Sequence, residues 1–332
     1  MPTEIAVVDP VNPSASIIAR AAELLRSGGL VAFPTETVYG LGADATNAAA
    51  VERIYRAKGR PATNPMIIHV GDIEAAKACS TEWPIDANRL AEAFWPGPLT
   101  IVVPASKSIA PIALAGGSTV GLRMPNNPIA LALLRAVDRP IAAPSANRSE
   151  TLSPTTTEHV LRTLNGRIDF ILDGGPTTGG VESTVVDLSV HPPRLLRPGL
   201  VTAKTIRAHL PLLEVASGAE TTEIEKSPGR SPRHYAPATP LELASDIVER
   251  VRQSTGSIAV VTFGEIKFAE SSNERIVHRR LPNDPTGAAR ELYGVLHELD
   301  LVGLDGIVVQ TPPSGDDWSA VRDRLQRAST RQ

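Results

Sequence analysis

The sequence predicts an α/β fold in which a larger domain with a mixed sheet precedes a smaller domain with a largely parallel sheet. The 332 residues exceed the usual size of one domain, and 42% of them are apolar, enough to form cores. Several short apolar runs follow one another without a helix between them, which indicates a mixed sheet. In the last third of the chain, strand-like and helix-like segments alternate, which is typical of a parallel sheet.

The first domain is expected over residues 1–210 and begins with two helices. Asn12 can cap the first helix, and Gly28 and Gly29 end it. A short buried strand, LVAF, follows. The second helix is expected over 47–58, and Gly59 stands where helices commonly need a left-handed residue.

The rest of this domain is predicted to be rich in strands, with a helix over 129–136. The expected strands are PMIIHV, LTIVVP, STVGLRM, PIAAP, IDFILD, STVVDL and PRLLRP. Residues 211–240 contain five prolines and no apolar period, and they are predicted to be a linker.

The second domain is expected over residues 241–332. The pattern predicts helices over 244–252 and 284–299, a C-terminal helix, and the strands SIAVVTF, RIVHRRL and GIVVQ. The C-terminal helix contains three arginines, which we expect on a solvated face: Arg322, Arg324 and Arg327.

Composition and missing motifs exclude several classes of protein. The net charge of −3 is unlike that of a dedicated nucleic-acid binder, and the single cysteine allows no intrachain disulfide. There is no signal-peptide core and no apolar run of about 18 residues, so a cytoplasmic protein without membrane contact is expected. P-loop, HExxH, CxxC and GxSxG motifs are absent. Gly40 and Gly42 match G-x-G-x-x-A weakly, and a tight turn is the preferred interpretation.

Two cations stand at the end of the second helix and indicate an anion site: Lys58 in its last turn and Arg60 just beyond it. A lysine at a helix C-terminus is mildly favourable by itself, by about 0.3–1 kcal/mol, so Lys58 alone could be structural. Arg60 lies beyond the helix, and Arg123 and Arg197 stand at the ends of apolar strands. Buried arginines need anionic partners. Internal salt bridges stay open as an alternative, with these candidate partners: Glu36, Asp173, Glu182 and Asp187.

Polar turns recur beside the predicted strands and favour a ligand. They are PTET at 34–37, PSAN at 144–147, SPTT at 153–156 and EST at 182–184. Each turn offers hydroxyls and free backbone N–H groups, although any one of them could be a simple helix cap. Together with the cations, they predict a pocket for a ligand with carboxylate and phosphate groups.

The ordered motifs resemble the YrdC-like family. They are FPTETVYGLG, AKGRP, NPMIIHV, FWPGPLT, VGLRMP, APSAN with SPT, ILDGGP with ESTVVD, and LLRPG. SPGRSPRHYAP, followed by an α/β domain, is similar to the long, two-domain form of the family, the threonylcarbamoyl-AMP synthases. This resemblance covers nearly the whole chain. It implies a twisted mixed sheet around a concave, positively lined cavity and a Rossmann-like C-terminal domain.

The resemblance also implies the reaction. Members condense L-threonine, bicarbonate and ATP into threonylcarbamoyl-adenylate and pyrophosphate. A separate tRNA threonylcarbamoyl-transferase complex then uses the adenylate to modify the adenosine next to the anticodon of ANN-decoding tRNAs. Magnesium would accompany ATP, held mainly by the phosphates and without a protein ligand set. Tight binding of tRNA is not expected.

The residue roles come from the same resemblance. Lys58 and Arg60 would be catalytic. Threonine contacts would come from Thr37, His69, Arg123, Ala143 and Ser183. ATP contacts would come from Lys58, Arg60, Asn64, Thr119, Ser145, Asn147, Ser153, Arg197 and Tyr235. The linker, with His234 and Tyr235, would cover the active site, and Tyr235 would gate ATP.

Three rival functions stay open at this point. Carbamoyl transfer, as in hydrogenase maturation proteins, would require acylphosphatase and zinc-finger modules, which the chain lacks. An RNA-binding protein is disfavoured by the acidic balance and by 4% aromatic residues. A regulatory module would bind ATP without releasing pyrophosphate.

Overall fold

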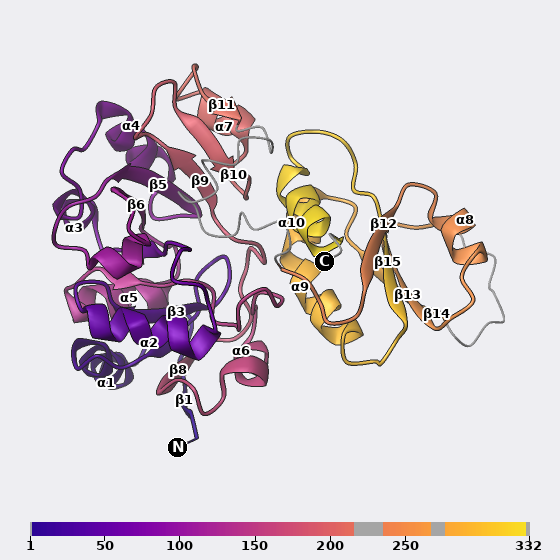
Figure 1. The fold of residues 1–332 in the computed structure, drawn as a ribbon, viewed down its shortest axis with the longest axis horizontal. Coiled ribbons are helices and arrows are strands. Elements are labelled where there is room, and N and C mark those ends of the chain that lie inside the picture. The colour runs from indigo at the N-terminus through magenta and orange to yellow at the C-terminus, as the bar shows by residue number, and fades with distance from the viewer. Residues whose placement is uncertain (1, 216–234, 267–275, 330–332) are drawn as a thin grey trace.

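The computed structural model describes residues 2–215, 235–266 and 276–329, which form two α/β domains (Figure 1). The helices are α1 Ala15–Arg26, α2 Ala48–Lys58, α3 Ile73–Ala78, α4 Ile85–Phe94, the 3-10 helix Pro111–Leu114, α5 Pro128–Val137, α6 Thr157–Leu164, α7 Ala203–Arg207, α8 Ile247–Arg252, α9 Pro285–Leu299 and α10 Ser319–Ser329. The strands are β1 Glu4–Val7, β2 Val31–Phe33, β3 Gly40–Asp44, β4 Ile67–His69, β5 Leu99–Pro104, β6 Thr119–Arg123, β7 Ile141–Ala142, β8 Phe170–Asp173, β9 Thr184–Asp187, β10 Arg194–Arg197, β11 Glu214–Val215, β12 Leu241–Ala244, β13 Ile258–Phe263, β14 Ile276–Leu281 and β15 Gly306–Gln310.

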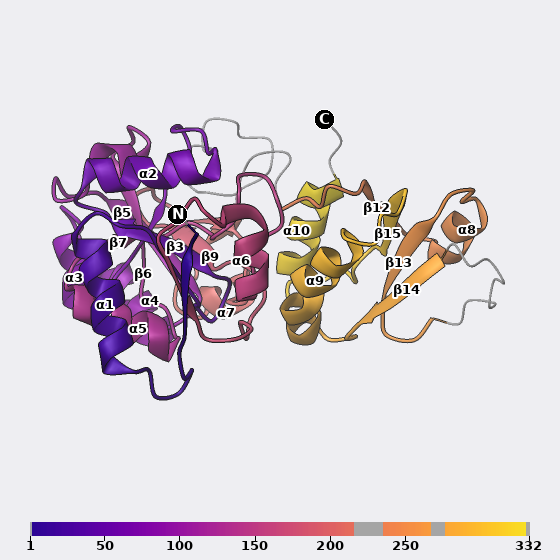
Figure 2. The same ribbon diagram turned by 90° about the horizontal axis from the view of Figure 1, so that it is seen from below.

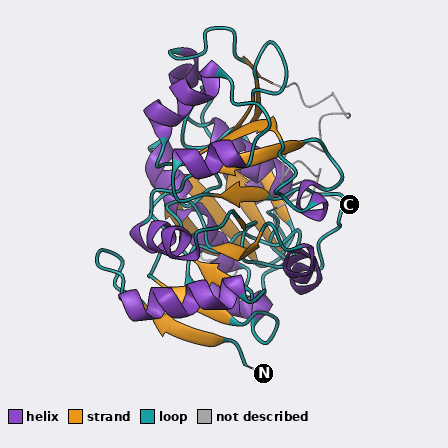
Figure 3. Cartoon of the chain, turned by 90° about the vertical axis from the view of Figure 1, so that its left-hand side faces the viewer, coloured by secondary structure: helices purple, strands orange, loops and turns teal. Residues whose placement is uncertain are grey.

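The N-terminal domain is built on one mixed sheet, in the order β1-β8-β2-β3-β7-β4-β6-β5-β9-β10-β11. Helices lie around the strands of this sheet (Figure 3). The central strands β4 and β6 run parallel, while β6 pairs antiparallel with β5. This confirms the predicted mixed sheet. Because β11 pairs with β10, the sheet extends into the segment that was predicted to be a linker.

Two residues delimit α2, and of these Gly59 acts as predicted. The side chain of Asn47 accepts hydrogen bonds from the backbone N–H groups of Ala49 and Ala50, so it caps the helix. Gly59 ends the helix with φ +60°, the left-handed conformation that glycine adopts without steric cost. Lys58 is the last residue of α2, and Arg60 directly follows the turn at Gly59.

The C-terminal domain has a four-stranded parallel sheet in the order β12-β15-β13-β14, which confirms the prediction. Helices α9 and α10 lie on the side of this sheet that faces the N-terminal domain (Figures 1 and 2). Their apolar residues share one buried cluster with Val38, Leu152 and Val181 of the N-terminal domain. At the same boundary, the rings of His159 in α6 and His297 in α9 stack with centroids 3.8 Å apart.

Several sequence predictions are wrong. Gly40 and Gly42 belong to β3 rather than to a tight turn; a Cβ on Gly42 would lie 2.9 Å from the ring of Phe33, so close packing explains this glycine. Ser14, not Asn12, occupies the N-cap position of α1. The helix predicted over 244–252 begins at Ile247, because β12 takes Leu241–Ala244 into the sheet.

The prediction that the arginines of the last helix lie on a solvated face is also wrong for one of them. Arg324 is only 1% exposed, because its guanidinium reaches Glu182 of the N-terminal domain at 2.6 Å. Most of the predicted linker lies outside the described residues. Among the described helices, none is long and apolar enough to cross a membrane.

Candidate active site

The predicted site residues gather around a cavity at the ends of the central strands. We call it the cationic cavity, and its volume is about 50 Å³. It is lined by Thr35, Thr37, Val38, Gly40, Arg60, Ile67, His69, Arg123, Ala143, Pro144, Ser145, Glu182, Ser183, Arg197 and Tyr235. Three arginines and several hydroxyls therefore face one small space.

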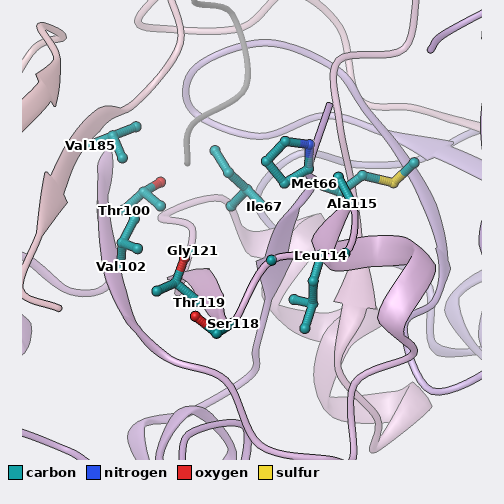
Figure 4. Close-up of a pocket in the computed structure, with 13 residues that line it drawn as sticks. Met66, Ile67, Thr100, Val102, Leu114, Ala115, Ser118, Thr119, Gly121 and Val185 are labelled. Atoms are coloured by element: carbon teal, nitrogen blue, oxygen red, sulfur yellow. The ribbon is translucent and has the colours of Figure 1, made fainter. Parts of the chain in front are cut away.

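A second cavity of about 210 Å³ adjoins it and shares Ile67 (Figure 4). Thr100, Val102 and Val185 lie on one side of this space, and Met66 and Leu114 lie on the other. The remaining lining comes from Pro65, from residues 115–119 and from Gly121, which has no side chain to fill the space. No lining residue carries a charge, so we call it the neutral cavity, and it suits a flat, uncharged group.

Lys58 and Arg60 are buried without an ion pair to any described carboxylate. The ammonium of Lys58 donates to the backbone carbonyls of Ser145 at 2.6 Å and Asn147 at 2.5 Å. The guanidinium of Arg60 donates to the carbonyls of Pro65 at 2.8 Å and Asn64 at 3.2 Å. Their exposed fractions are 2% and 8%.

Burial sets the electrostatics of these two cations. It lowers the pKa of Lys58 well below its usual value, and the neighbouring Arg60 lowers it further. Burial also lowers the pKa of Arg60 to about 10. Both positive charges are thus held at a cost in the free protein, which an anionic ligand would relieve.

Arg123 and His69 stand side by side at the ends of β6 and β4, where the register pairs them. Arg123 lies 2.8 Å from a carboxylate oxygen of Glu36 and donates to the hydroxyl of Thr37 at 2.9 Å. The salt-bridge alternative raised by the sequence is therefore realised for Arg123. Burial, with the charge of Arg123, lowers the pKa of His69 well below its usual value, so His69 is neutral.

Arg197, at the end of β10, joins the wall of the cavity to Tyr235. Its guanidinium donates to the carbonyl of Ser183 at 3.0 Å and to the hydroxyl of Ser183 at 3.1 Å. It also donates to the hydroxyl of Tyr235 at 3.4 Å. Tyr235 is buried in this wall, whereas its neighbour His234 lies outside the described residues.

Ten of the predicted site residues line the two cavities. Nine line the cationic cavity: Thr37, Arg60, His69, Arg123, Ala143, Ser145, Ser183, Arg197 and Tyr235. Thr119 lines the neutral cavity. Four others line neither cavity but bond to residues that do or hold the adjoining loop: Lys58, Asn64, Asn147 and Ser153.

Sequence reasoning missed two groups of residues. The small residues at 115–118 form part of the neutral cavity, and their lack of charge gave no signal. Tyr293 and Arg324 reach Glu182 from the C-terminal domain, 111 and 142 residues away in the chain. The arginine-rich pattern of α10 was visible in the sequence, but its contact with the other domain was not.

Two family models together cover most of the chain. The Sua5/YciO/YrdC model, described as telomere recombination, matches residues 23–199. The model of the C-terminal domain of threonylcarbamoyl-AMP synthase matches residues 201–330.

Relatives match over nearly the full length. The threonylcarbamoyl-AMP synthase of Bacillus subtilis is 41% identical, over 97% of this chain and 96% of its own. That of Schizosaccharomyces pombe is 36% identical, over 97% and 90%. The crystal structure of Pyrococcus abyssi Sua5 complexed with L-threonine is similar with a TM-score of 0.90 and 38% identity, over 98% of both chains. The chain therefore belongs to the threonylcarbamoyl-AMP synthase family, in its two-domain form, and is an enzyme of that family.

Proposed function

We propose that the two adjoining cavities condense L-threonine, bicarbonate and ATP into threonylcarbamoyl-AMP and pyrophosphate. Synthesis of threonylcarbamoyl-AMP is the activity of this family and the first step of threonylcarbamoyladenosine modification of tRNA. The observation that carries the proposal is the burial of Lys58 and Arg60 without an ion pair to a described carboxylate. Buried cations of this kind are stabilised by an anion, and ATP and a carbamate are both anions.

The chemistry requires positive charge more than it requires a nucleophilic side chain. The threonine amine forms a C–N bond to bicarbonate and water leaves, which gives N-carboxythreonine. An oxygen of that carboxylate then attacks the α-phosphorus of ATP, and pyrophosphate leaves. Attacker and target are both negative and would repel each other strongly in a buried site. Positioning and cationic stabilisation therefore account for catalysis.

The cationic cavity is the proposed place for threonine. The Pyrococcus relative carries L-threonine in its crystal structure, and this chain offers Thr37, Ala143 and Ser183 around its cationic cavity. Arg123 pairs with Glu36 in the free protein. In the complex it would bind the threonine carboxylate instead. Neutral His69 would contact the substrate without adding charge.

ATP would span both cavities. Its adenine would enter the neutral cavity beside Thr119, and its phosphates would meet Arg60, Ser145 and Arg197. Lys58 would stabilise the phosphates, assisted by its hold on the loop of Ser145 and Asn147. The remaining proposed ATP contacts are Asn64, Ser153 and Tyr235, with Tyr235 as the gate.

Magnesium and the later steps belong to the same proposal. The described residues contain no cluster of three potential metal ligands, so they do not fit a protein-bound metal, and magnesium would arrive on the phosphates of ATP. The adenylate would pass to a tRNA threonylcarbamoyl-transferase complex, and a cytoplasmic location is proposed with it.

Pyrophosphate release by the full-length protein tests the proposed function. The reaction contains magnesium, ATP, bicarbonate and L-threonine, and each component is omitted in turn. We expect release only when all are present, with L-serine a much poorer substrate than L-threonine. ATP binding without release under any condition would contradict the proposal and leave a nucleotide-binding module.

A further inference from the structure

A buried cluster joins the C-terminal domain to the cationic cavity. Arg324 in α10 donates from Nε to a carboxylate oxygen of Glu182 at 2.6 Å and from Nη2 to the Glu182 carbonyl at 3.3 Å. The hydroxyl of Tyr293 in α9 lies 3.2 and 3.3 Å from the two carboxylate oxygens. Glu182 is thus held from the side of the C-terminal domain.

The other side of Glu182 belongs to the cavity wall. Its carboxylate accepts a hydrogen bond from the Ser153 hydroxyl at 2.5 Å, and its side chain lines the cationic cavity. The next residue, Ser183, is bonded by Arg197 at both its carbonyl and its hydroxyl. A movement of Glu182 would therefore displace two of the proposed substrate contacts.

Arg324 also supports Tyr235 directly. Its guanidinium carbon lies 5.2 Å from the centre of the Tyr235 ring, a distance typical of a cation–π contact. The hydroxyl of the same tyrosine accepts a hydrogen bond from Arg197 in the cavity wall. One arginine of the C-terminal domain therefore contacts both Glu182 and Tyr235.

Charge makes this arrangement relevant to ATP. Burial alone would raise the pKa of Glu182, but Arg324 and then Arg197 outweigh burial and lower it, so Glu182 is ionised. An ionised carboxylate on the cavity wall repels phosphate unless a cation neutralises it. Arg324 is such a cation, and it is 1% exposed, so solvent does not screen it. Arg324 also pairs with Asp323 at 2.6 Å, but Asp323 has a second cation in Arg327 at 2.9 Å.

We infer that Arg324 is a positioning residue of the synthase reaction, brought to the cavity by the C-terminal domain. It neutralises Glu182 and fixes its orientation, and Glu182 in turn holds Ser153 through its hydroxyl, behind the cavity wall. The inference rests on the proposed function of the cationic cavity. It makes the C-terminal domain part of the active site rather than a separate module.

Kinetics of pyrophosphate release in full-length variants test the inference. Arg324→Met leaves Glu182 charged without this partner, so we expect the KM for ATP to rise at least tenfold in the folded protein. Arg324→Lys keeps the charge and should recover most of that loss. In Arg324→Met/Glu182→Gln the repelling charge is gone, so the KM for ATP should return to within threefold of wild type while kcat stays at least fivefold lower.

Arg322→Met is the matched control on the same helix. Arg322 donates to the carbonyls of Pro313 and Gly315 within its own domain, so its loss should leave the KM for ATP and kcat unchanged. If Arg324→Met does not fold, the double variant, which lacks both charges, carries the test. Wild-type KM and kcat in the folded Arg324→Met protein or in the double variant would overturn the inference. Absence of three-substrate release in wild type would instead overturn the proposed function.

Discussion

The variant Arg60→Met tests whether Arg60 binds an anionic ligand or only stabilises the fold. Burial lowers the pKa of Arg60 to about 10, below the usual range of an arginine. At 1.36 kcal/mol for each pKa unit, the free fold disfavours the charged form by roughly 3 kcal/mol. Methionine removes this cost. It also leaves the carbonyl of Pro65 without its donor, at about 1–3 kcal/mol, whereas the carbonyl of Asn64 keeps the hydroxyl of Tyr55 at 3.2 Å.

These opposing contributions nearly cancel, so the free energy of unfolding of Arg60→Met should lie within about 2 kcal/mol of wild type. Turnover should respond differently, because a preorganised donor to a developing negative charge contributes about 10²–10³ in kcat. Urea denaturation gives the stability, and pyrophosphate release gives the turnover. A loss of more than about 4 kcal/mol, or turnover within tenfold of wild type, would refute the reasoning.

Two further predictions address the neutral cavity and the domain boundary. Gly121→Val should raise the KM for ATP about tenfold without changing threonine binding by calorimetry, because even an added Cβ would lie 3.2 Å from Thr100. An unchanged KM would place the adenine elsewhere. Burial lowers the pKa of His159 to about 3 and that of His297 to about 4, so the unfolded chain binds protons more readily below about pH 6.5. The free energy of unfolding should therefore fall as the pH is lowered from about 6.5 towards 4. His159→Phe removes one of the two groups, so the free energy of unfolding should change less steeply with pH, by up to about 1.4 kcal/mol per pH unit. The same pH dependence in wild type and variant would contradict this prediction.

Local signals predicted much of the fold because their causes are local. Asn47 and Gly59 delimit α2 through a side-chain cap and a left-handed turn, both of which involve only nearby residues. The order of the motifs predicted most of the cavity in the same way, since His69 and Arg123 end adjacent parallel strands. Their roles toward substrate stay predictions.

The failures come from packing between distant segments. Gly42 resembles a turn glycine in sequence, but it lies in β3 because Phe33 of the neighbouring strand occupies the space of a side chain. Arg324 resembles a surface residue, since nothing within its own helix indicates that the helix faces Glu182. Neither contact follows from periodicity, which reports which face of an element is buried but not what covers it.

Calorimetric titration of the full-length protein with ATP, inorganic triphosphate and adenosine tests the anion site most directly. If Lys58, Arg60 and Arg197 provide most of the binding, triphosphate should retain an affinity within about tenfold of that of ATP, and adenosine should bind at least 100-fold more weakly. Adenosine that binds as tightly as ATP, with no binding of triphosphate, would mean that the buried cations do not hold the phosphates.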